Sequence, residues 1–238
     1  TNKCIIMTLN EIAYNILNLV RGGRSNQSEH ISLDQIKFNI KHYRAMLIRR
    51  DYARNGKITR HLEQDLGCLE VEEVNPSKCC NLPVECSVSR TKKKIPRTVR
   101  FNFKEAITYV GDVTGLTRIP IVESSVISYL PFDKHTADKY KAYMIEDYMY
   151  IYNAKGLKFI NVRGIFEDPT DLKNFQCENG TCWDDNSDFP MPADMIHAIT
   201  NGMASGELRF LTGTFSDTLA DNSQDNKTII GKPQANQQ

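Results

Sequence analysis

The chain has 238 residues, 40% of them hydrophobic and 25% charged, which is the composition of an ordinary folded protein with a sizeable core. Its 30 lysines and arginines nearly balance its 29 aspartates and glutamates, so the net charge of +1 excludes a strong overall attraction to nucleic acid or to a membrane surface. No apolar run approaches the ~20 residues that span a bilayer, and Ile5–Met7 is too short for the core of a signal peptide. We therefore expect synthesis in a cytosol.

Two capping signals predict two helices at the N-terminal end of the chain. Thr8 with Glu11, and later Ser32 with Gln35, have the spacing of a capping box. Apolar residues follow each signal at helical spacing: Leu9, Ile12, Ala13, Ile16, Leu17 and Val20 after the first, and Leu33, Ile36, Ile40, Tyr43, Leu47 and Ile48 after the second.

Glycines indicate where these helices end. We expect the first helix to stop at Gly22-Gly23 and the second near Asn55-Gly56. Leu62 and Leu66 then predict a short third helix, which would run from Thr59 to Gly67.

The middle of the chain, residues 68–188, favours strands, because prolines interrupt it and its segments alternate or are rich in β-branched and aromatic residues. The clearest predicted strands are Tyr143–Asp147, Met149–Asn153 and Lys158–Phe166. Asn153–Gly156 predicts a hairpin turn between the last two of them. Tyr148, Tyr150 and Tyr152 would share one face of a strand, and a half-buried sheet face explains them better than an aromatic ligand platform.

Pro190 and Pro192 introduce a last helix, whose apolar stripe is Ala193, Ile196, Ile199, Met203, Leu208 and Leu211. Gly202 and Gly206 each weaken a helix by roughly 1 kcal/mol relative to alanine, and they would also allow a neighbouring helix to approach closely. Beyond Gly213 the chain is polar, and we expect it to fray.

The order of elements predicts an α+β protein with one small helical bundle and a β-rich insertion, because no helix with a single apolar stripe is stable alone. The predicted division is 1–67 for the N-terminal bundle helices, 68–188 for the β-rich insertion, 189–212 for the C-terminal bundle helix, and 213–238 for a polar, flexible tail.

No catalytic or cofactor-binding residues emerge from the sequence. The adjacent carboxylates Glu72-Glu73 and Asp184-Asp185 would point away from each other in a strand. Ser205 lies one residue away from the spacing of a nucleophile elbow, and it falls in a predicted helix. The five histidines have no metal-binding spacing. We therefore expect a protein that is not an enzyme.

Cysteines offer one weak metal hypothesis, a structural zinc site formed by Cys68, Cys79, Cys80 and Cys86. Cys79 and Cys80 are adjacent and no Cys-x-x-Cys knuckle is present, so buried free thiols are the favoured alternative.

A second group of cysteines suggests a disulfide. Asn179-Gly180 is a strong signal for a two-residue hairpin turn, and such a turn would set Cys177 directly opposite Cys182. Two cysteines in that position can approach bonding distance. A reducing cytosol opposes the bond during synthesis, whereas a particle released from the cell loses that protection.

Charges are segregated along the chain. Seven basic residues form a basic segment: Arg90, Lys92, Lys93, Lys94, Arg97, Arg100 and Lys104. The second helix adds Arg44, Arg49, Arg50 and Arg54. Acidic residues gather later: Glu167, Asp168, Asp171, Glu178, Asp184, Asp185 and Asp188.

Three interpretations of these charges remain open. The basic segment alone would fit nucleic acid. Basic and acidic surfaces on one near-neutral chain equally fit a head-to-tail contact between copies, and such a contact closes into a ring. Solvated faces without a partner are the third possibility.

Several segments of the chain resemble the head–tail connector subunits of crAss-like bacteriophages, which are more remotely similar to the tail tubular adaptors of short-tailed phages. These segments are Ala45–Gly56, Cys68–Cys80, Arg90–Pro96, Tyr150–Asp168 and Phe189–Ile196, including the runs Ala-Met-Leu-Ile-Arg-Arg-Asp-Tyr and Tyr-Ile-Tyr-Asn-Ala-Lys-Gly-Leu. The resemblance covers most of Thr8–Leu211 and carries over no catalytic residue.

The resemblance implies a dodecameric ring below the capsid portal. We accordingly expect a structural virion protein that connects the portal to the tail and encloses the DNA exit channel. Its expected partners are further copies of itself, the portal protein, neighbouring tail components and, transiently, genomic DNA, with no membrane and no cofactor. Expected interface residues are Arg90, Lys92, Lys93, Lys94, Arg97, Arg100, Asp184, Asp185 and Asp188.

Two other functions stay as alternatives. A nucleic-acid-binding module would use residues 90–104, and binding of duplex DNA by the isolated subunit at moderate salt would favour it. A zinc enzyme is the third hypothesis, and metal analysis of the purified protein would decide it.

Overall fold

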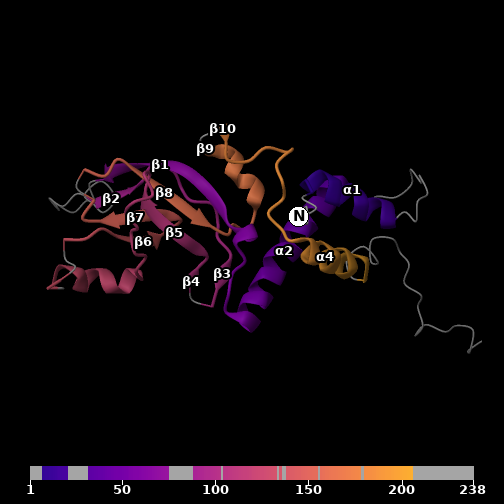
Figure 1. The fold of residues 1–238 in the computed structure, drawn as a ribbon, viewed down its shortest axis with the longest axis horizontal. Helices are drawn as coiled ribbons and strands as arrows, with labels where there is room; N and C mark the ends of the chain where they lie inside the picture. The colour runs from indigo at the N-terminus through magenta and orange to yellow at the C-terminus, as the bar shows by residue number, and fades with distance from the viewer. Residues whose placement is uncertain are drawn as a thin grey trace, which may run out of the picture.

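The computed structural model describes residues 7–20, 32–74, 88–102, 104–132, 134–135, 138–154, 156–177 and 180–205. Helices at the two ends of this part of the chain flank a strand-rich middle, so the predicted α+β class is confirmed. Figure 1 shows helices α1, α2 and α4 gathered on one side of the molecule and the sheet on the other. Three predictions fall outside the described residues: the helix stop at Gly22-Gly23, the last apolar helix positions Leu208 and Leu211, and the polar segment 213–238.

Helix α1 (Leu9–Val20) begins at the predicted capping box. The Thr8 N–H donates to Glu11 Oε2 at 2.8 Å, and the Glu11 N–H donates to Thr8 Oγ1 at 3.2 Å. This satisfies donors at the start of the helix that have no partner within it. The predicted apolar stripe is buried at Leu9, Ile12, Ala13, Ile16 and Leu17.

Helix α2 (Leu33–Asn55) also begins and ends as predicted. Ser32 Oγ accepts the N–H of Gln35 at 3.1 Å, and Gly56 ends the helix in the left-handed conformation with φ 63°. Helix α4 (Ala193–Ser205) packs against α2. There, a Cβ built on Gly202 would lie 3.0 Å from Tyr43 Cε1, so this glycine does allow the close approach of two helices.

Six strands form the main sheet in the order β5-β8-β1-β2-β7-β6, and every neighbouring pair is antiparallel. Their bounds are β1 Gln64–Val74, β2 Val88–Thr91, β5 Ile107–Asp112, β6 Lys141–Ile145, β7 Tyr148–Tyr152 and β8 Phe159–Gly164. Two short ribbons pair β3 Arg100–Phe101 with β4 Lys104–Glu105 and β9 Gln176–Cys177 with β10 Gly180–Thr181. The 3-10 turns are η1 Arg60–Leu62, η2 Ser124–Phe132 and η3 Pro169–Asn174.

The predicted third helix is wrong. Only η1 is helical in this region, and β1 begins at Gln64. Leu62 and Leu66 are both buried, but Leu66 is buried as a strand residue. The four-residue spacing of two leucines at a turn-to-strand junction therefore imitated the periodicity of a helix.

The predicted hairpin at Asn153–Gly156 is also wrong. β7 pairs with β2 and β6, whereas β8 pairs with β1 and β5, so the two strands are not neighbours. The tight hairpin joins β6 to β7 instead, and it turns at Glu146 and Asp147, which both have positive φ. The chain does bend at Gly156, but it then crosses to the other half of the sheet.

One continuous segment, residues 117–122, covers both edges of the main sheet. The Ile119 N–H donates to the Val110 oxygen of β5 at 2.8 Å. The Val122 N–H donates to the Ala142 oxygen of β6 at 2.8 Å, and the Ala142 N–H donates to the Pro120 oxygen at 2.9 Å. The two edge strands are thus linked through this segment, which protects edges that would otherwise pair with other chains.

Helix α2 fixes the bundle to the sheet. Its Tyr52 ring stacks on Phe101 of β3, with ring centroids 4.0 Å apart. Arg44, nearer the middle of the helix, makes two further contacts. Its Nη1 donates to the Phe166 backbone oxygen at 2.8 Å, and its Nε donates to the Pro190 backbone oxygen at 2.9 Å. Arg44 is fully buried, and this desolvation lowers its pKa to about 9, with Asp168 partly opposing the shift. Arg44 is therefore a junction residue and not part of the basic surface that the sequence suggested.

Candidate functional site

The predicted basic segment lies on β2, on β3 and β4, and on the connection between β2 and β3. Within the described residues, three of its seven cations form ion pairs with carboxylates: Arg90 with Glu72 at 3.3 Å, Lys92 with Glu70 at 2.9 Å, and Arg100 with Glu105 at 3.2 Å. The pair with Glu70 also raises the pKa of Lys92. The segment is therefore partly neutralised within the subunit, although exposed pairs of this kind are individually weak.

Two further lysines of the basic segment contact aromatic rings. Lys93 Nζ lies 5.7 Å from the centroid of the Phe175 ring and donates to the Asn174 backbone oxygen at 3.0 Å, and Lys94 Nζ lies 5.4 Å from the centroid of the Tyr148 ring. The Arg90 guanidinium also lies over Tyr148, at 4.3 Å. Arg90 and Lys94 of the same subunit therefore already occupy the neighbourhood of the Tyr148 ring.

The three tyrosines of β7 are half-buried, whereas Met149 and Ile151 between them are buried. This alternation is that of a strand with one face on the core, so the predicted half-buried sheet face is confirmed. Tyr150 stacks with Tyr143 on the neighbouring strand β6, at 5.3 Å between centroids.

Glu178 lies outside the described residues, and five of the other six predicted acidic residues divide into two groups. Glu167 and Asp168 face α2, where they pair with Arg49 and Lys41. Burial favours the neutral form of Asp168, but hydrogen bonds from Lys41 and Thr170 outweigh it, so the pKa of this carboxyl is below its ordinary value. These two carboxylates therefore help to hold the bundle against the sheet.

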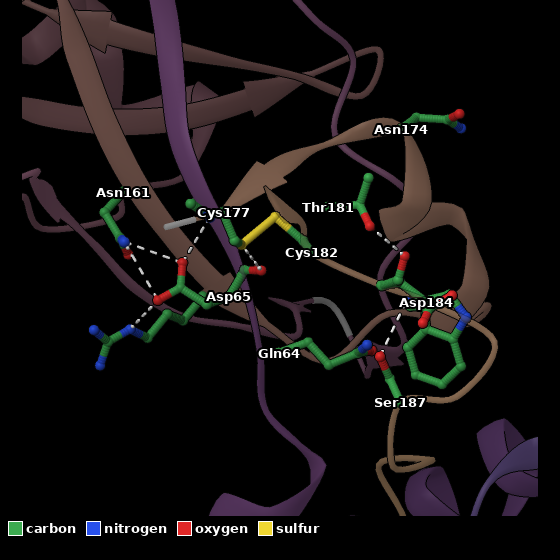
Figure 2. Close-up of a disulfide and its surroundings, with 12 residues drawn as sticks. Gln64, Asp65, Asn161, Asn174, Cys177, Thr181, Cys182, Asp184 and Ser187 are labelled. Carbon is green, nitrogen blue, oxygen red and sulfur yellow. Dashed lines mark hydrogen bonds and ion pairs between the residues drawn. A yellow bond between two sulfur atoms is a disulfide. The ribbon is translucent and has the colours of Figure 1, made fainter. Parts of the chain in front are cut away.

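The second group is Asp184, Asp185 and Asp188, which we call the acidic loop. All three residues are exposed, and none of them forms an ion pair within the described residues. The Asp184 carboxylate accepts the Asp185 N–H at 2.7 Å, and the Asp184 N–H donates to Ser187 Oγ at 3.0 Å (Figure 2). Asp184 therefore shapes the loop, while Asp185 and Asp188 present free charge.

Cys177 and Cys182 form a disulfide, with Cα atoms 4.9 Å apart. The register differs from the expected one, because Cys177 pairs with Gly180 and the Cys182 N–H donates to the Phe175 oxygen at 3.0 Å. The expectation that the two cysteines lie directly opposite each other is thus wrong. The turn signal located the hairpin but not its register, so the disulfide joins the strands diagonally.

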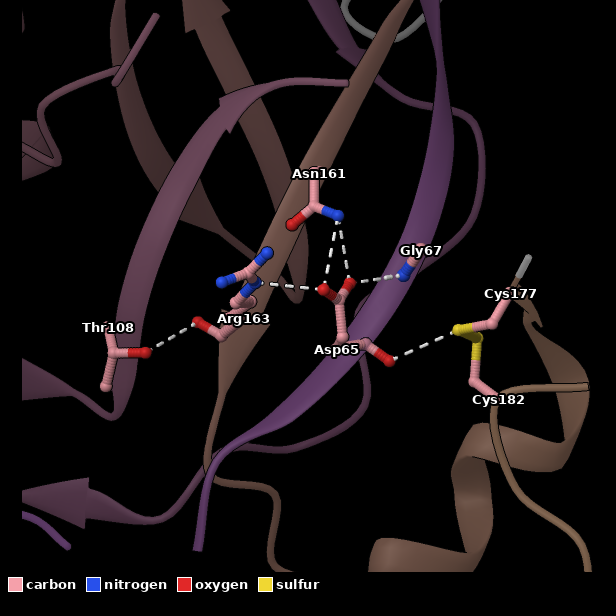
Figure 3. Close-up of polar contacts among 7 residues, drawn as sticks. All are labelled: Asp65, Gly67, Thr108, Asn161, Arg163, Cys177 and Cys182. Carbon is pink, nitrogen blue, oxygen red and sulfur yellow. Dashed lines mark hydrogen bonds and ion pairs between the residues drawn. A yellow bond between two sulfur atoms is a disulfide. The ribbon is translucent and has the colours of Figure 1, made fainter. Parts of the chain in front are cut away.

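The disulfide hairpin packs against the start of β1, as Figures 2 and 3 show. Cys177 Sγ lies 3.6 Å from the Asp65 backbone oxygen. The Asp65 carboxylate accepts the Gly67 N–H at 2.7 Å, Asn161 Nδ2 at 3.0 Å and Arg163 Nε at 2.9 Å (Figure 3). Asp65 therefore has a structural role, holding β1, β8 and the bulge in β1 together.

Replacing Cys177 and Cys182 together by serine is expected to lower the free energy of unfolding by about 2 kcal/mol, because the closed loop is short and its closure entropy is small. Urea unfolding with and without dithiothreitol measures the effect. The reductant should destabilise the wild type and Cys68→Ser alike and leave the double variant unchanged. A wild type insensitive to the reductant would contradict a stabilising disulfide.

A groove of about 1130 Å³ runs between the first residues of β1, the disulfide hairpin and the connection to α4. Trp183, Phe189 and Met191 provide apolar parts of its lining, and Asp188 of the acidic loop borders it. Trp183 is only 4% exposed, and its Nε1–H has no hydrogen-bond partner within the described residues. The groove thus places apolar lining beside the acidic loop, while the unpaired Trp183 donor itself is buried in the wall.

The other residues that the sequence raised are Ser205, whose spacing argues against a nucleophile, and the four cysteines of the zinc hypothesis. Ser205 donates its hydroxyl hydrogen bond to the Asn201 oxygen of its own helix at 2.8 Å, which is a helical and not a catalytic environment. Cys68 is exposed on β1, but Cys79, Cys80 and Cys86 lie outside the described residues, so the zinc hypothesis remains a prediction. Where the structure describes the chain, no three His, Cys, Asp or Glu residues are grouped to hold a metal ion.

Arg44 and the groove are the features that sequence reasoning missed. The signal for Arg44 was available, because it lies four residues from both Ile40 and Ile48 and so belongs to the buried stripe of α2. The groove had no such signal, since its lining comes from segments that only the fold brings together.

Comparison with known families identifies the chain. The family model described as phage tail ring protein 2, of crAss-like phages, matches residues 11–226, and no curated protein matches. Within the described residues, no helix is both long and apolar enough to cross a bilayer. Membership in this family makes the protein a structural component of the virion tail. The resemblance noted in the sequence is confirmed, and the chain belongs to the tail ring protein 2 family of crAss-like phages.

Proposed function

We propose that twelve copies of the protein form a ring that connects the capsid portal to the tail and encloses the DNA exit channel. The observation that carries this proposal is the match to the tail ring family over residues 11–226. A ring needs two different surfaces on each subunit, and the segregation of the predicted interface residues into the basic segment and the acidic loop supports such a contact.

A structural role without catalysis agrees with this family. Nucleic-acid binding through residues 90–104 stays the alternative, and the carboxylate partners of Arg90, Lys92 and Arg100 weaken the basic segment for DNA and for a neighbouring copy alike. Apolar burial must supply most of the affinity between subunits, while exposed charges set their orientation.

Electron cryomicroscopy of particles made with and without the protein tests the proposal. With the protein, we expect a twelve-fold ring directly below the portal with the DNA path through its centre. Without it, we expect DNA-filled heads that lack tails, and supplying the wild-type gene should restore the tails. A ring located only in the distal tail, or heads joined normally to tails in its absence, would overturn the portal connection.

A further inference from the structure

The C-terminal end of α2 carries positive charges that its own subunit does not neutralise. Arg50, Arg54 and Lys57 are exposed, and none of them forms an ion pair within the described part of the chain. Asp51 is the only acidic residue between positions 50 and 57. This end of the helix is therefore net positive.

The β3–β4 ribbon extends this positive surface. Tyr52 of α2 stacks on Phe101, and Phe101 pairs with Lys104 of β4, which is exposed. Figure 1 shows β3 and β4 beside the lower end of α2. We call Arg50, Arg54, Lys57 and Lys104 the basic face.

The opposite charge is concentrated in another part of the chain. Residues 174–205 contain no lysine or arginine, and the three aspartates of the acidic loop are exposed in the middle of this stretch. In Figure 1 the connection from β10 to α4, which carries the acidic loop, leaves the sheet at the top of the view, whereas the C-terminal end of α2 points to the bottom. The connection then runs back to the helices, where Asp188 forms a bridge with Thr8 at the start of α1, so the acidic loop and the basic face are separate surfaces of one subunit.

From this complementarity we infer that the basic face of one subunit binds the acidic loop of the next copy around the ring. The inference rests on the proposed ring, and it assigns the two halves of the contact that repeats between subunits. Two separate surfaces of one chain form a head-to-tail contact, and such a contact closes into a ring when its rotation allows. The partner is a second copy of this chain.

Apolar surface beside both halves favours a protein partner over DNA. Met46, one turn before Arg50 on the outer side of α2, is 44% exposed, and Phe38 two turns earlier is 68% exposed. On the other half, Asp188 of the acidic loop borders the groove that Trp183, Phe189 and Met191 help to line. A contact with phosphates alone would leave the exposed side chains of Met46 and Phe38 uncovered.

Charge reversal on each half tests the inference. The first variant carries Arg50→Glu and Arg54→Glu, and the second carries Asp185→Lys and Asp188→Lys, which leaves the loop-shaping Asp184 in place. Each is supplied to infected cells whose phage lacks the gene, and its incorporation into purified particles is measured. We expect each variant alone to be incorporated at least about tenfold less than wild type, because every subunit boundary becomes repulsive. Lys134→Glu with Lys139→Glu, exposed residues outside both surfaces, is the matched control and should be incorporated normally.

Two combinations make the test specific. A mixture of the two reversed variants should assemble, because the acidic α2 of the first variant is complementary to the basic loop of the second. A chain with all four substitutions should also assemble, because its two surfaces are again opposite in charge. Normal incorporation of either reversed variant alone would overturn the inference and leave the ring intact. Failure of both combinations would also overturn it, and simultaneous loss of duplex DNA binding by the first variant would then assign the basic face to DNA. Absence of wild-type rings from particles would instead contradict the proposed function.

Discussion

Replacing Arg44 by alanine is expected to lower the free energy of unfolding by about 3 kcal/mol. The substitution removes the donor of the buried Phe166 O and of the partly buried Pro190 O, and an unpaired buried acceptor costs roughly 1–3 kcal/mol. It also opens a cavity where a fully buried side chain lies over the Phe189 ring. Burial of the Arg44 guanidinium is itself unfavourable, because desolvation lowers its pKa to about 9. Removing the group relieves this penalty, so the net loss is smaller than the sum of the hydrogen-bond and cavity costs.

Urea unfolding measured by circular dichroism checks this prediction. Arg50→Ala is the matched control, since it removes an exposed arginine from the same helix and should change stability by less than about 0.5 kcal/mol. An Arg44 variant as stable as the control would mean that the two carbonyl groups find other partners and that the junction does not depend on this side chain.

Local signals in the sequence located the helices well. The capping residues Thr8 and Ser32 define helix starts through contacts within four positions, and Gly56 ends α2 through its own backbone conformation. Such contacts depend on neighbours in the sequence, so they can be recognised without knowing the fold. The same is true of the turn between the two disulfide-bonded cysteines.

Strand pairing could not be obtained in this way. The turn at Asn153–Gly156 is present as a bend, but whether the next strand returns beside β7 or crosses to β1 is decided by packing between distant segments. Charge was misassigned for the same reason: Arg44 and Arg49 lie on one helix with Arg50, yet the first is buried and the second pairs with Glu167. Which charges remain free for a partner is a property of the fold and not of the sequence pattern.

Replacing Gly67 by alanine is expected to lower the free energy of unfolding by about 3 kcal/mol. Gly67 lies in the bulge of β1 with φ 66°, a conformation that costs alanine roughly 1–2 kcal/mol. A Cβ at this position would also lie 2.4 Å from the Gln176 oxygen and 3.2 Å from Cys177 Cα. Both contacts are with the backbone of the disulfide hairpin, which cannot yield by changing a rotamer, so overpacking adds a further cost of about 1–3 kcal/mol.

Gly56→Ala separates the two contributions to this cost. Gly56 has nearly the same backbone conformation, with φ 63°, but no atom lies within 4 Å of a Cβ built on it. Alanine there should cost only the conformational term, about 1 kcal/mol, so the difference of about 2 kcal/mol between the variants reports the contact of β1 with the disulfide hairpin. Equal losses in urea unfolding would show that the hairpin moves away without cost. A larger loss at Gly67 that shrinks when the disulfide is reduced would show that the disulfide is what holds the hairpin against β1.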